Sequence, residues 1–246
     1  MKNTCCLVVL LVPALTGAAG AADHCGGMAA VPAGDFVMGS VTGGADERPR
    51  RTVHLDNFLM DKCEVTASDL AAFMKAAGHK PAKQPDWSCP ASPAVAVDWF
   101  EADAYCRHAG KRLPTEAEWE KAARGGLDGE YGFSGGPENL DDYAWYMDNS
   151  GRRAHPAGEK KPNAYGLYDM HGNAAEWTAD WYAPYGPAAA ARAGPQTGTQ
   201  RVIRGGAWNW YAFYFALNLR VSERSRAYPA RRSSSVGFRC AKTAGR

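Results

Sequence analysis

The chain has 246 residues, with 28 basic and 26 acidic side chains and a formal net charge of +2. This near balance gives no support for nucleic-acid binding, which strongly basic surfaces typically carry. Gly, Pro and Trp are plentiful, at 27, 15 and 8 residues, and few segments have helical periodicity. The composition favours a loop-rich α+β protein that is long enough for one sizeable core.

Residues 1–22 have the features of a secretory signal peptide. Lys2 supplies a positive start, residues 7–15 form a short apolar run, and residues 19–21 offer a small-residue cleavage site. The run is too short to span a membrane, and no later segment is long and apolar enough to do so. We therefore expect an exported protein, periplasmic or extracellular, in which residues 23–246 form a single domain.

Two extended segments are expected near the N-terminus. Residues 52–60 alternate apolar and polar side chains, and residues 29–38 carry a similar set of branched and aromatic side chains. Between them, residues 39–51 are Gly-rich and charged, which is typical of a long exposed loop. A β-hairpin is the simplest arrangement of these segments.

Three helices are expected after Thr66, Asp98 and Thr115. Each of these residues is followed three positions later by an acidic residue, which is the spacing of a capping box: Asp69, Glu101 and Glu118. The helices carry apolar stripes and small residues, so we expect them to be scaffold. Arg112 and Glu116 are candidates for a buried ion pair.

The stretch 162–181 holds the densest grouping of turn formers, carboxylates and tryptophans. Within eight residues it places Asp169, Gly172, Asn173 and Glu176. A loop so rich in oxygen atoms suits calcium, which takes carboxylate and carbonyl ligands. The alternative is a tight turn in which Asp169 and Glu176 accept backbone N–H groups. Glu176 and Asp180 could also form an acid–base pair, although roles as metal ligand and structural acceptor are favoured.

Residues 208–215 form an aromatic run: Trp208, Trp210, Tyr211, Phe213, Tyr214 and Phe215. A run this apolar predicts either core filling or the wall of a cleft that stacks a ring or a sugar. Arginines follow closely, and their guanidinium groups could hold an anionic group: Arg220, Arg224 and Arg226. The binding cleft predicted from these residues comprises Trp208, Trp210, Tyr211, Tyr214, Arg220 and Arg224. Arg231 and Arg232 are expected on a solvated loop.

Five motifs in order resemble the sulfatase-modifying-factor family, whose best-known members are formylglycine-generating enzymes. They are FVMGS (36–40), DKCEVT (61–66), GKRLPTEAEWEKAARGG (110–126), GLYDMHGNAAEWTADW (166–181), and RVIRGGAW (201–208) with VGFRC (236–240). The resemblance covers residues 28–241. It implies a C-type-lectin-like α+β fold, loop-rich, with twisted antiparallel sheets and two or three short helices.

The resemblance also implies a structural calcium ion. Its ligands would be the side chains of Asp169 and Glu176 and the carbonyl groups of Gly172 and Ala174. Asp169 stands where the family often has Asn, and the added charge should not weaken a calcium site. The family's second calcium site is not carried over, because Trp145 stands where a polar residue is expected.

Five cysteines follow residue 22, an odd number that leaves one over in an oxidising compartment. The resemblance pairs Cys106 with Cys240. If the N-terminal hairpin forms, Cys25 could meet Cys63, which would leave Cys89 free; this second pairing stays open.

Formylglycine-generating enzymes hold copper(I) between two cysteine thiolates, four and nine residues after a Gly-Gly pair. The matching positions here are Trp210 and Phe215, or Tyr211 and Ala216 if one residue is inserted. No cysteine lies between residues 106 and 240, and Ala207 replaces the serine that follows Gly-Gly in the family. Copper(I) prefers thiolates, so no copper is expected here and the chain should not generate formylglycine.

No two of the six histidines are spaced as local zinc or iron ligands, and any other redox metal stays unassigned. Two functions of different class remain. The first is a periplasmic maturation or oxidation factor for a peptide or peptide-derived substrate, with exported relatives in pyoverdine chromophore maturation as the precedent for a cysteine-free site. The second is a non-catalytic, lectin-like module that binds a peptide, a protein or a glycan. A buried titratable group or a histidine-lined pocket beside Trp210 would favour the enzyme, and an open aromatic groove with no such group would favour the binder.

Overall fold

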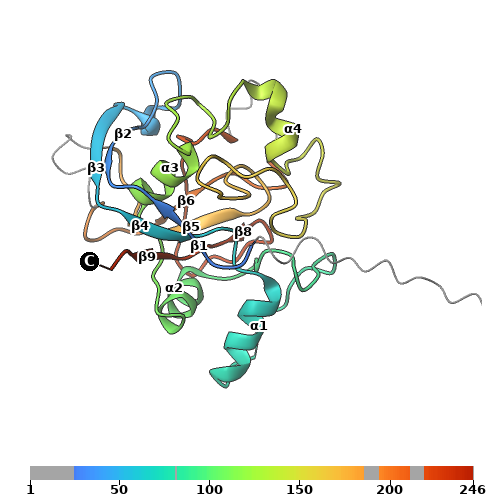
Figure 1. Cartoon of the computed structure of the whole chain (residues 1–246). Helices are drawn as coiled ribbons and strands as arrows, with labels where there is room; N and C mark the ends of the chain where they lie inside the picture. Colours follow the sequence, from blue (N-terminus) through green and yellow to red (C-terminus); the bar gives the residue numbers. More distant parts are fainter. Residues whose placement is uncertain (1–24, 81, 186–193, 211–218, 246) are drawn as a thin grey trace, which may run out of the picture.

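The computed structural model describes residues 25–80, 82–185, 194–210 and 219–245 (Figure 1). The predicted signal segment lies outside these residues. Helices occur as α1 (Ala67–Ala76), α2 (Trp99–His108), α3 (Glu116–Arg124) and α4 (Leu140–Tyr143), with 3-10 turns at Ala45–Glu47 and Pro137–Asn139. Strands occur as β1 (Met28–Val31), β2 (Gly34–Met38), β3 (Arg51–Leu55), β4 (Phe58–Asp61), β5 (Ala175–Trp181), β6 (Arg201–Arg204), β7 (Ser225–Ala227), β8 (Val236–Gly237) and β9 (Ala241–Thr243). Short helices, small sheets and long connections make this the expected loop-rich α+β fold.

The predicted N-terminal hairpin is confirmed, although each expected segment is divided into two strands. β2 pairs antiparallel with β3, and β1 pairs antiparallel with β4, which also pairs with β9. Pro32 separates β1 from β2, because proline has no N–H to give to a ladder. The loop between β2 and β3 was expected to be exposed, but its Glu47 is buried at 4% exposure. Glu47 is buried because it pairs with Arg220, 173 residues away in the chain.

The three predicted helices begin where their capping signals place them. Thr66, Asp98 and Thr115 each accept a backbone N–H from the residue three positions later, in complete capping boxes. α3 ends at Gly125, whose φ of 58° is in the left-handed region that glycine tolerates. α3 is buried along its whole length, which makes it the central helix of the molecule. α1 and α2 lie together at the lower edge of Figure 1.

A four-stranded sheet in the order β7-β6-β5-β8 separates two parts of the interior. Side chains alternate along a strand, so neighbouring residues face opposite sides of the sheet. Trp177 and Ile203 join the apolar cluster that contains Trp99 of α2. Glu176 and Arg204 point instead toward α3, where they contact Trp119 and Glu120 respectively. One face of the sheet is therefore apolar and the other is ionic.

Two disulfides connect distant parts of the chain. Cys106 in α2 is bonded to Cys240, as the family resemblance implied, and Cys25 is bonded to Cys63. Cys89 is exposed and carries a free thiol. Both pairings are thus confirmed. Within the described residues, no helix is both long enough and apolar enough to cross a bilayer.

Candidate functional site

A cleft of about 290 Å³ opens on the apolar side of the four-stranded sheet. The described residues that line it are Trp177, Gln200, Ile203, Trp210, Ser225, Arg226, Ala227, Tyr228, Arg231, Ser233, Ser235 and Val236. We call it the tryptophan cleft. Its lining comes from β5, β6, β7 and β8, from the residue before β6 and from the loops that follow β6 and β7, so one continuous surface is built from segments far apart in sequence.

Trp210 is held in the cleft wall by backbone contacts. Its N–H donates to the carbonyl of Ala207 at 2.9 Å, and its carbonyl accepts from the N–H of Met147 at 3.0 Å. Its indole is half-buried and packs against the apolar cluster that includes Trp177. An aromatic ring with one packed face and one accessible face is suited to stacking on a ligand.

The described lining of the tryptophan cleft lacks the side chains that most often act as general acids and bases. None of its described lining residues is His, Cys, Asp, Glu or Lys. Its hydroxyl groups belong to Tyr228 and to Ser225, Ser233 and Ser235.

The residues predicted for the cleft are placed in different parts of the molecule. Trp208 lies near the cleft, where its ring meets that of Trp87 edge-to-face at 5.9 Å and its Nε1–H donates to the carbonyl of Ser234. Tyr211, Tyr214 and Phe215 lie outside the described residues. Arg220 and Arg224 do not line the cleft. They are 2% and 6% exposed, and their guanidinium groups are bound inside the protein.

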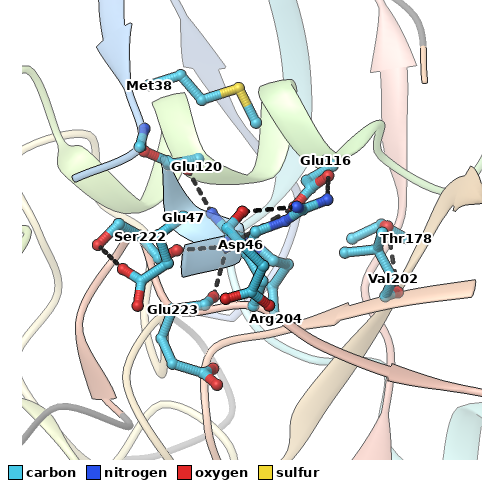
Figure 2. Close-up of polar contacts among 12 residues, drawn as sticks. Met38, Asp46, Glu47, Glu116, Glu120, Thr178, Val202, Arg204, Ser222 and Glu223 are labelled. Atoms are coloured by element: carbon cyan, nitrogen blue, oxygen red, sulfur yellow. Dashed lines mark hydrogen bonds and ion pairs between the residues drawn. The ribbon is translucent and has the colours of Figure 1, made fainter. Parts of the chain in front are cut away.

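Arg220 and Arg224 belong to a buried ionic network on the α3 side of the sheet. Figure 2 shows the part of this network around Arg204. Arg220 binds both carboxylate oxygens of Glu47 at 2.7 Å. Arg224 binds both oxygens of Glu116 at 2.5 and 2.8 Å. The expected pair of Arg112 with Glu116 is therefore wrong: Arg112 binds Glu118 at 2.6 Å instead. Sequence proximity alone could not reveal that Glu116 faces an arginine 108 residues away.

Arg204 lies at the centre of the same network. One of its terminal nitrogens donates to Glu120 at 2.5 Å and to the carbonyl of Val221 at 2.9 Å, and the other donates to the carbonyls of Ser222 and Glu223. The Glu223 carboxyl lies close by, but its Oε2 is buried without a hydrogen-bond partner. Burial raises the pKa of Glu223 to about 8, and the nearby Glu47 also raises it, against the opposing effect of Arg204.

The predicted calcium ligands lie beside a second group of buried charges. Glu176 accepts from Trp119 Nε1 at 2.7 Å and from the Arg239 guanidinium at 2.7 to 2.9 Å. Asp169 accepts the N–H of Gly158 through Oδ2, whereas its Oδ1 is buried without a partner. Burial raises the pKa of Asp169 to about 6.

Glu64 is a buried carboxylate of this group that the sequence did not single out. It accepts the N–H of Ala174 and the side-chain amide of Asn173, both at 2.8 Å. Burial, followed by the charges of Asp169 and Glu176, raises its pKa well above the usual value. Its position in the DKCEVT motif, between Cys63 and Val65, was the available signal.

These residues fit a calcium ion in part. The unpartnered Oδ1 of Asp169 is an oxygen ligand of the kind calcium takes, whereas Glu176 is already paired with Arg239. Among the residues that the structure describes, no group of three or more His, Cys, Asp and Glu side chains is arranged around a metal position. Any calcium site would therefore depend on backbone carbonyl groups, as expected for Gly172 and Ala174.

Asp180 is a structural acceptor rather than a partner of Glu176 in catalysis. Its Oδ2 accepts the N–H of Glu116 at 2.6 Å in the first turn of α3, and its Oδ1 accepts the N–H of Gly194 at 2.9 Å. Burial raises the pKa of Asp180, and the two backbone hydrogen bonds lower it.

The chain is similar to proteins of one known family. The family model described as "Sulfatase-modifying factor enzyme 1-like domain" matches residues 15–244. The chain is 34% identical to a formylglycine-generating enzyme of Streptomyces coelicolor, over 89% of this chain and 90% of that one. It is 30% identical to the mouse "Inactive C-alpha-formylglycine-generating enzyme 2", over 89% and 86%.

Two solved structures share the fold over most of their length. PvdO from Pseudomonas aeruginosa matches with a TM-score of 0.79 and 30% identity, over 90% of this chain and 96% of that one. Treponema denticola variable protein 1 matches with a TM-score of 0.76 and 29% identity, over 88% and 95%.

Proposed function

We propose that this chain, which belongs to the sulfatase-modifying factor enzyme 1-like family, is an exported protein that recognises a peptide segment in the tryptophan cleft. The observation that carries the proposal is the composition of that cleft. It combines a half-buried indole, an apolar base and polar rim groups, and its described lining contains no His, Cys, Asp, Glu or Lys. Ligand sites of this kind bind through shape, stacking and a few polar contacts.

Export is supported by two features. The first 22 residues have the three parts of a signal peptide. Two disulfides, Cys25–Cys63 and Cys106–Cys240, form and persist most readily in an oxidising compartment.

We further propose that the chain does not generate formylglycine by copper–thiolate chemistry. Trp210 or Tyr211 stands where the first of the two thiolates would be, depending on the register, and no cysteine lies between residues 106 and 240. The free thiol of Cys89 is a single sulfur, whereas the family's centre needs two. An anaerobic copper(I) titration, followed by exposure of a cysteine-containing peptide to oxygen, tests this directly. We expect the titration to show no stoichiometric copper binding and mass spectrometry to show no aldehyde on the peptide. Either copper binding or aldehyde formation would overturn the proposal.

A peptide array and a glycan array, both probed with the protein after signal removal, test the binding function. The critical variant is Trp210→Ala, and the matched control is Phe100→Ala, an exposed aromatic residue outside the cleft. We expect peptides to be captured by the unaltered protein and by Phe100→Ala, and not by Trp210→Ala. Binding to glycans alone, or peptide binding indifferent to Trp210, would contradict the proposal.

A maturation enzyme is the second candidate, and the similarity to proteins named formylglycine-generating enzymes favours it. The same captured peptides distinguish the two. Incubation with the protein in air, followed by mass spectrometry, would give an unchanged mass for a binder. Loss of hydrogen or gain of oxygen, at more than one turnover per protein, would establish catalysis instead.

We also propose a structural calcium ion, held by Asp169 and Glu176 with the carbonyls of Gly172 and Ala174. The unpartnered Oδ1 of Asp169 supports it. A ligand present at a hundred times its Kd stabilises a protein by about 2.7 kcal/mol, which corresponds to a rise in Tm of roughly 5 to 10 °C for a chain of this size. We expect calcium to raise the Tm of the unaltered protein by this amount. The rise in Tm should be smaller in Asp169→Ala and undiminished in the control variant Glu223→Gln. The same Tm with calcium and with a chelator would refute the site.

A further inference from the structure

The strand β7 forms one edge of the four-stranded sheet. It pairs with β6 in an antiparallel register, with Ser225 opposite Ile203 and Ala227 opposite Arg201, and no other described strand pairs with its outer side. The outer backbone groups of an edge strand are a template for pairing with another extended chain. β7 is also part of the tryptophan cleft, because all three of its residues line it. A peptide paired with β7 would therefore run along the mouth of the cleft.

Strand geometry then decides which part of that peptide enters the cleft. Alternate side chains of an extended chain point to the same face, so every second residue of the peptide would face Trp177 and Trp210. These indoles and Ile203 offer an apolar base that suits an apolar or aromatic side chain. A glycan can stack on an indole, but it has no regular row of N–H and C=O groups to match a strand edge. The edge position of β7 therefore favours a peptide over a glycan.

Arg231 is the charged residue whose position suits a ligand in the cleft, and no Asp or Glu is among the described lining residues. Arg226 also lines the cleft, but it pairs opposite Val202, so its side chain points to the other face of the sheet. The Arg226 guanidinium lies over the ring of Tyr182, 4.3 Å from its centroid. Arg232, the neighbour of Arg231, binds Asp98 and Glu101 at 2.7 and 2.6 Å. Arg231 is exposed, and none of the described carboxylates forms an ion pair with it.

Two serine hydroxyl groups line the same cleft as Arg231. Ser233 and Ser235 both line it, with 3.0 Å between their hydroxyl oxygens. A guanidinium beside hydroxyl donors can bind a carboxylate through charge-assisted hydrogen bonds. A basic side chain would meet Arg231 and no described acid, so the cleft disfavours it.

We propose that the ligand of the tryptophan cleft is an acidic, extended peptide: it pairs with β7, places an apolar side chain on Trp177 and Trp210, and binds Arg231 through a carboxylate. This inference rests on the proposed peptide-binding function and specifies the charge of the peptide and its mode of docking. The carboxylate can belong to an Asp or Glu side chain or to a peptide C-terminus, and the test separates these two sources.

The test uses short fluorescent peptides with one aromatic residue and a Glu beside it, measured by anisotropy with the full-length mature protein. Comparison peptides replace Glu with Gln, replace it with Lys, or keep Gln and leave the C-terminus free instead of amidated. The critical variant is Arg231→Gln. The matched control is Arg232→Gln, which changes the net charge equally in the same loop but removes a residue outside the cleft lining.

We expect the Glu peptide to bind roughly three to ten times more tightly than the Gln peptide, and the Lys peptide to bind weakest, as for one partly exposed charge pair. Arg231→Gln should remove this preference and Arg232→Gln should keep it. Tighter binding of the peptide with a free C-terminus would identify the terminus as the source of the carboxylate. Equal affinity of the Glu and Gln peptides, with binding still dependent on Trp210, would overturn the acidic specificity alone. Absence of binding by every peptide would overturn the proposed function as well.

Backbone methylation of the peptide tests whether it pairs with β7. Peptides methylated on alternate backbone nitrogens lose the hydrogen bonds of either the odd or the even residues. Because only alternate N–H groups of a strand face its partner, we expect one methylation pattern to abolish binding and the other to preserve it. Equal affinities for the two patterns would show that the peptide does not pair with β7.

Discussion

The two faces of the β7-β6-β5-β8 sheet bury very different side chains. On the α3 face, Glu176 and Arg204 are fully buried and bound to protein partners. On the opposite face, Trp177 and Ile203 are equally buried but lie beneath a cleft. Buried charges must be satisfied inside the protein, because an unpaired one costs several kcal/mol. The ionic face is thus closed to a peptide-sized ligand, whereas the apolar face can leave an indole partly accessible at little cost.

This difference explains why Arg220 and Arg224 are structural. Both follow the aromatic run in sequence, which suggested a shared role with it, but their side chains lie on the ionic side, where Glu47 and Glu116 hold them. Arg231 follows β7 and lies on the side of the cleft. Adjacency in sequence is therefore a poor guide to which face of the sheet an arginine serves.

Arg204 should contribute more to stability than Glu223 of the same ionic face. Arg204→Leu removes one cation from Glu120 and the donors from three backbone carbonyls, so we expect a loss of about 3 to 5 kcal/mol in the free energy of unfolding. Arg204→Lys should lose less, because one ammonium keeps the charge but cannot reach all four acceptors. Urea denaturation measures both variants. A loss below about 1 kcal/mol for Arg204→Leu would mean that the ionic face does not stabilise the fold.

On the apolar side of the sheet, the disulfide between Cys106 and Cys240 joins α2 to the segment before β9. Their sequence separation is 134, against 38 for Cys25 and Cys63. Closure of the longer loop restricts the unfolded chain more, so replacing Cys106 and Cys240 with alanine should cost about 1 kcal/mol more than replacing the other pair, within a range of roughly 2 to 5 kcal/mol. Denaturant unfolding of the two double variants is the measurement. A larger cost for the Cys25–Cys63 pair would contradict this account.

Glu223 should make the stability of the folded protein depend on pH. Its pKa is about 8 in the folded protein, mainly because of burial, against an ordinary value of 4.5. Between these values the folded state holds a proton that the unfolded state has released, so stability falls as pH rises. From pH 6 to pH 7.5 the loss should be about 2 kcal/mol. Glu223→Gln should flatten this part of the profile in thermal unfolding, and an unchanged slope would show that another group causes it.

The smallest effect on stability is expected at the cleft. Trp210 is half-buried, so Trp210→Ala should lower the free energy of unfolding by about 1 to 2 kcal/mol, whereas Trp177→Ala should cost about 3 to 5 kcal/mol because Trp177 is buried. Peptide binding should nevertheless be lost in Trp210→Ala. Equal destabilisation by the two variants would place Trp210 in the core rather than in a binding site.

Local signals in the sequence determined much of the framework. The capping boxes at Thr66, Asp98 and Thr115 depend on contacts within one turn of helix, so the sequence specified where each helix begins. The alternation in residues 52–60 depends on the period of a strand and predicted the hairpin. The motif resemblance added the family and the Cys106–Cys240 pair. The absence of cysteine after residue 106 and before residue 240 is also readable from the sequence alone.

Only the tertiary structure decided which charged residues meet. Glu47 and Arg220 are 173 residues apart, and Glu116 and Arg224 are 108 apart, so no local pattern links them. The same is true of Glu64, which joins Asp169 and Glu176 across more than a hundred residues. The tryptophan cleft likewise exists because β5, β6 and β7 lie side by side in one sheet. Helix starts and strand periods are set by interactions between near neighbours, whereas ion pairs and clefts are set by the packing of the whole chain.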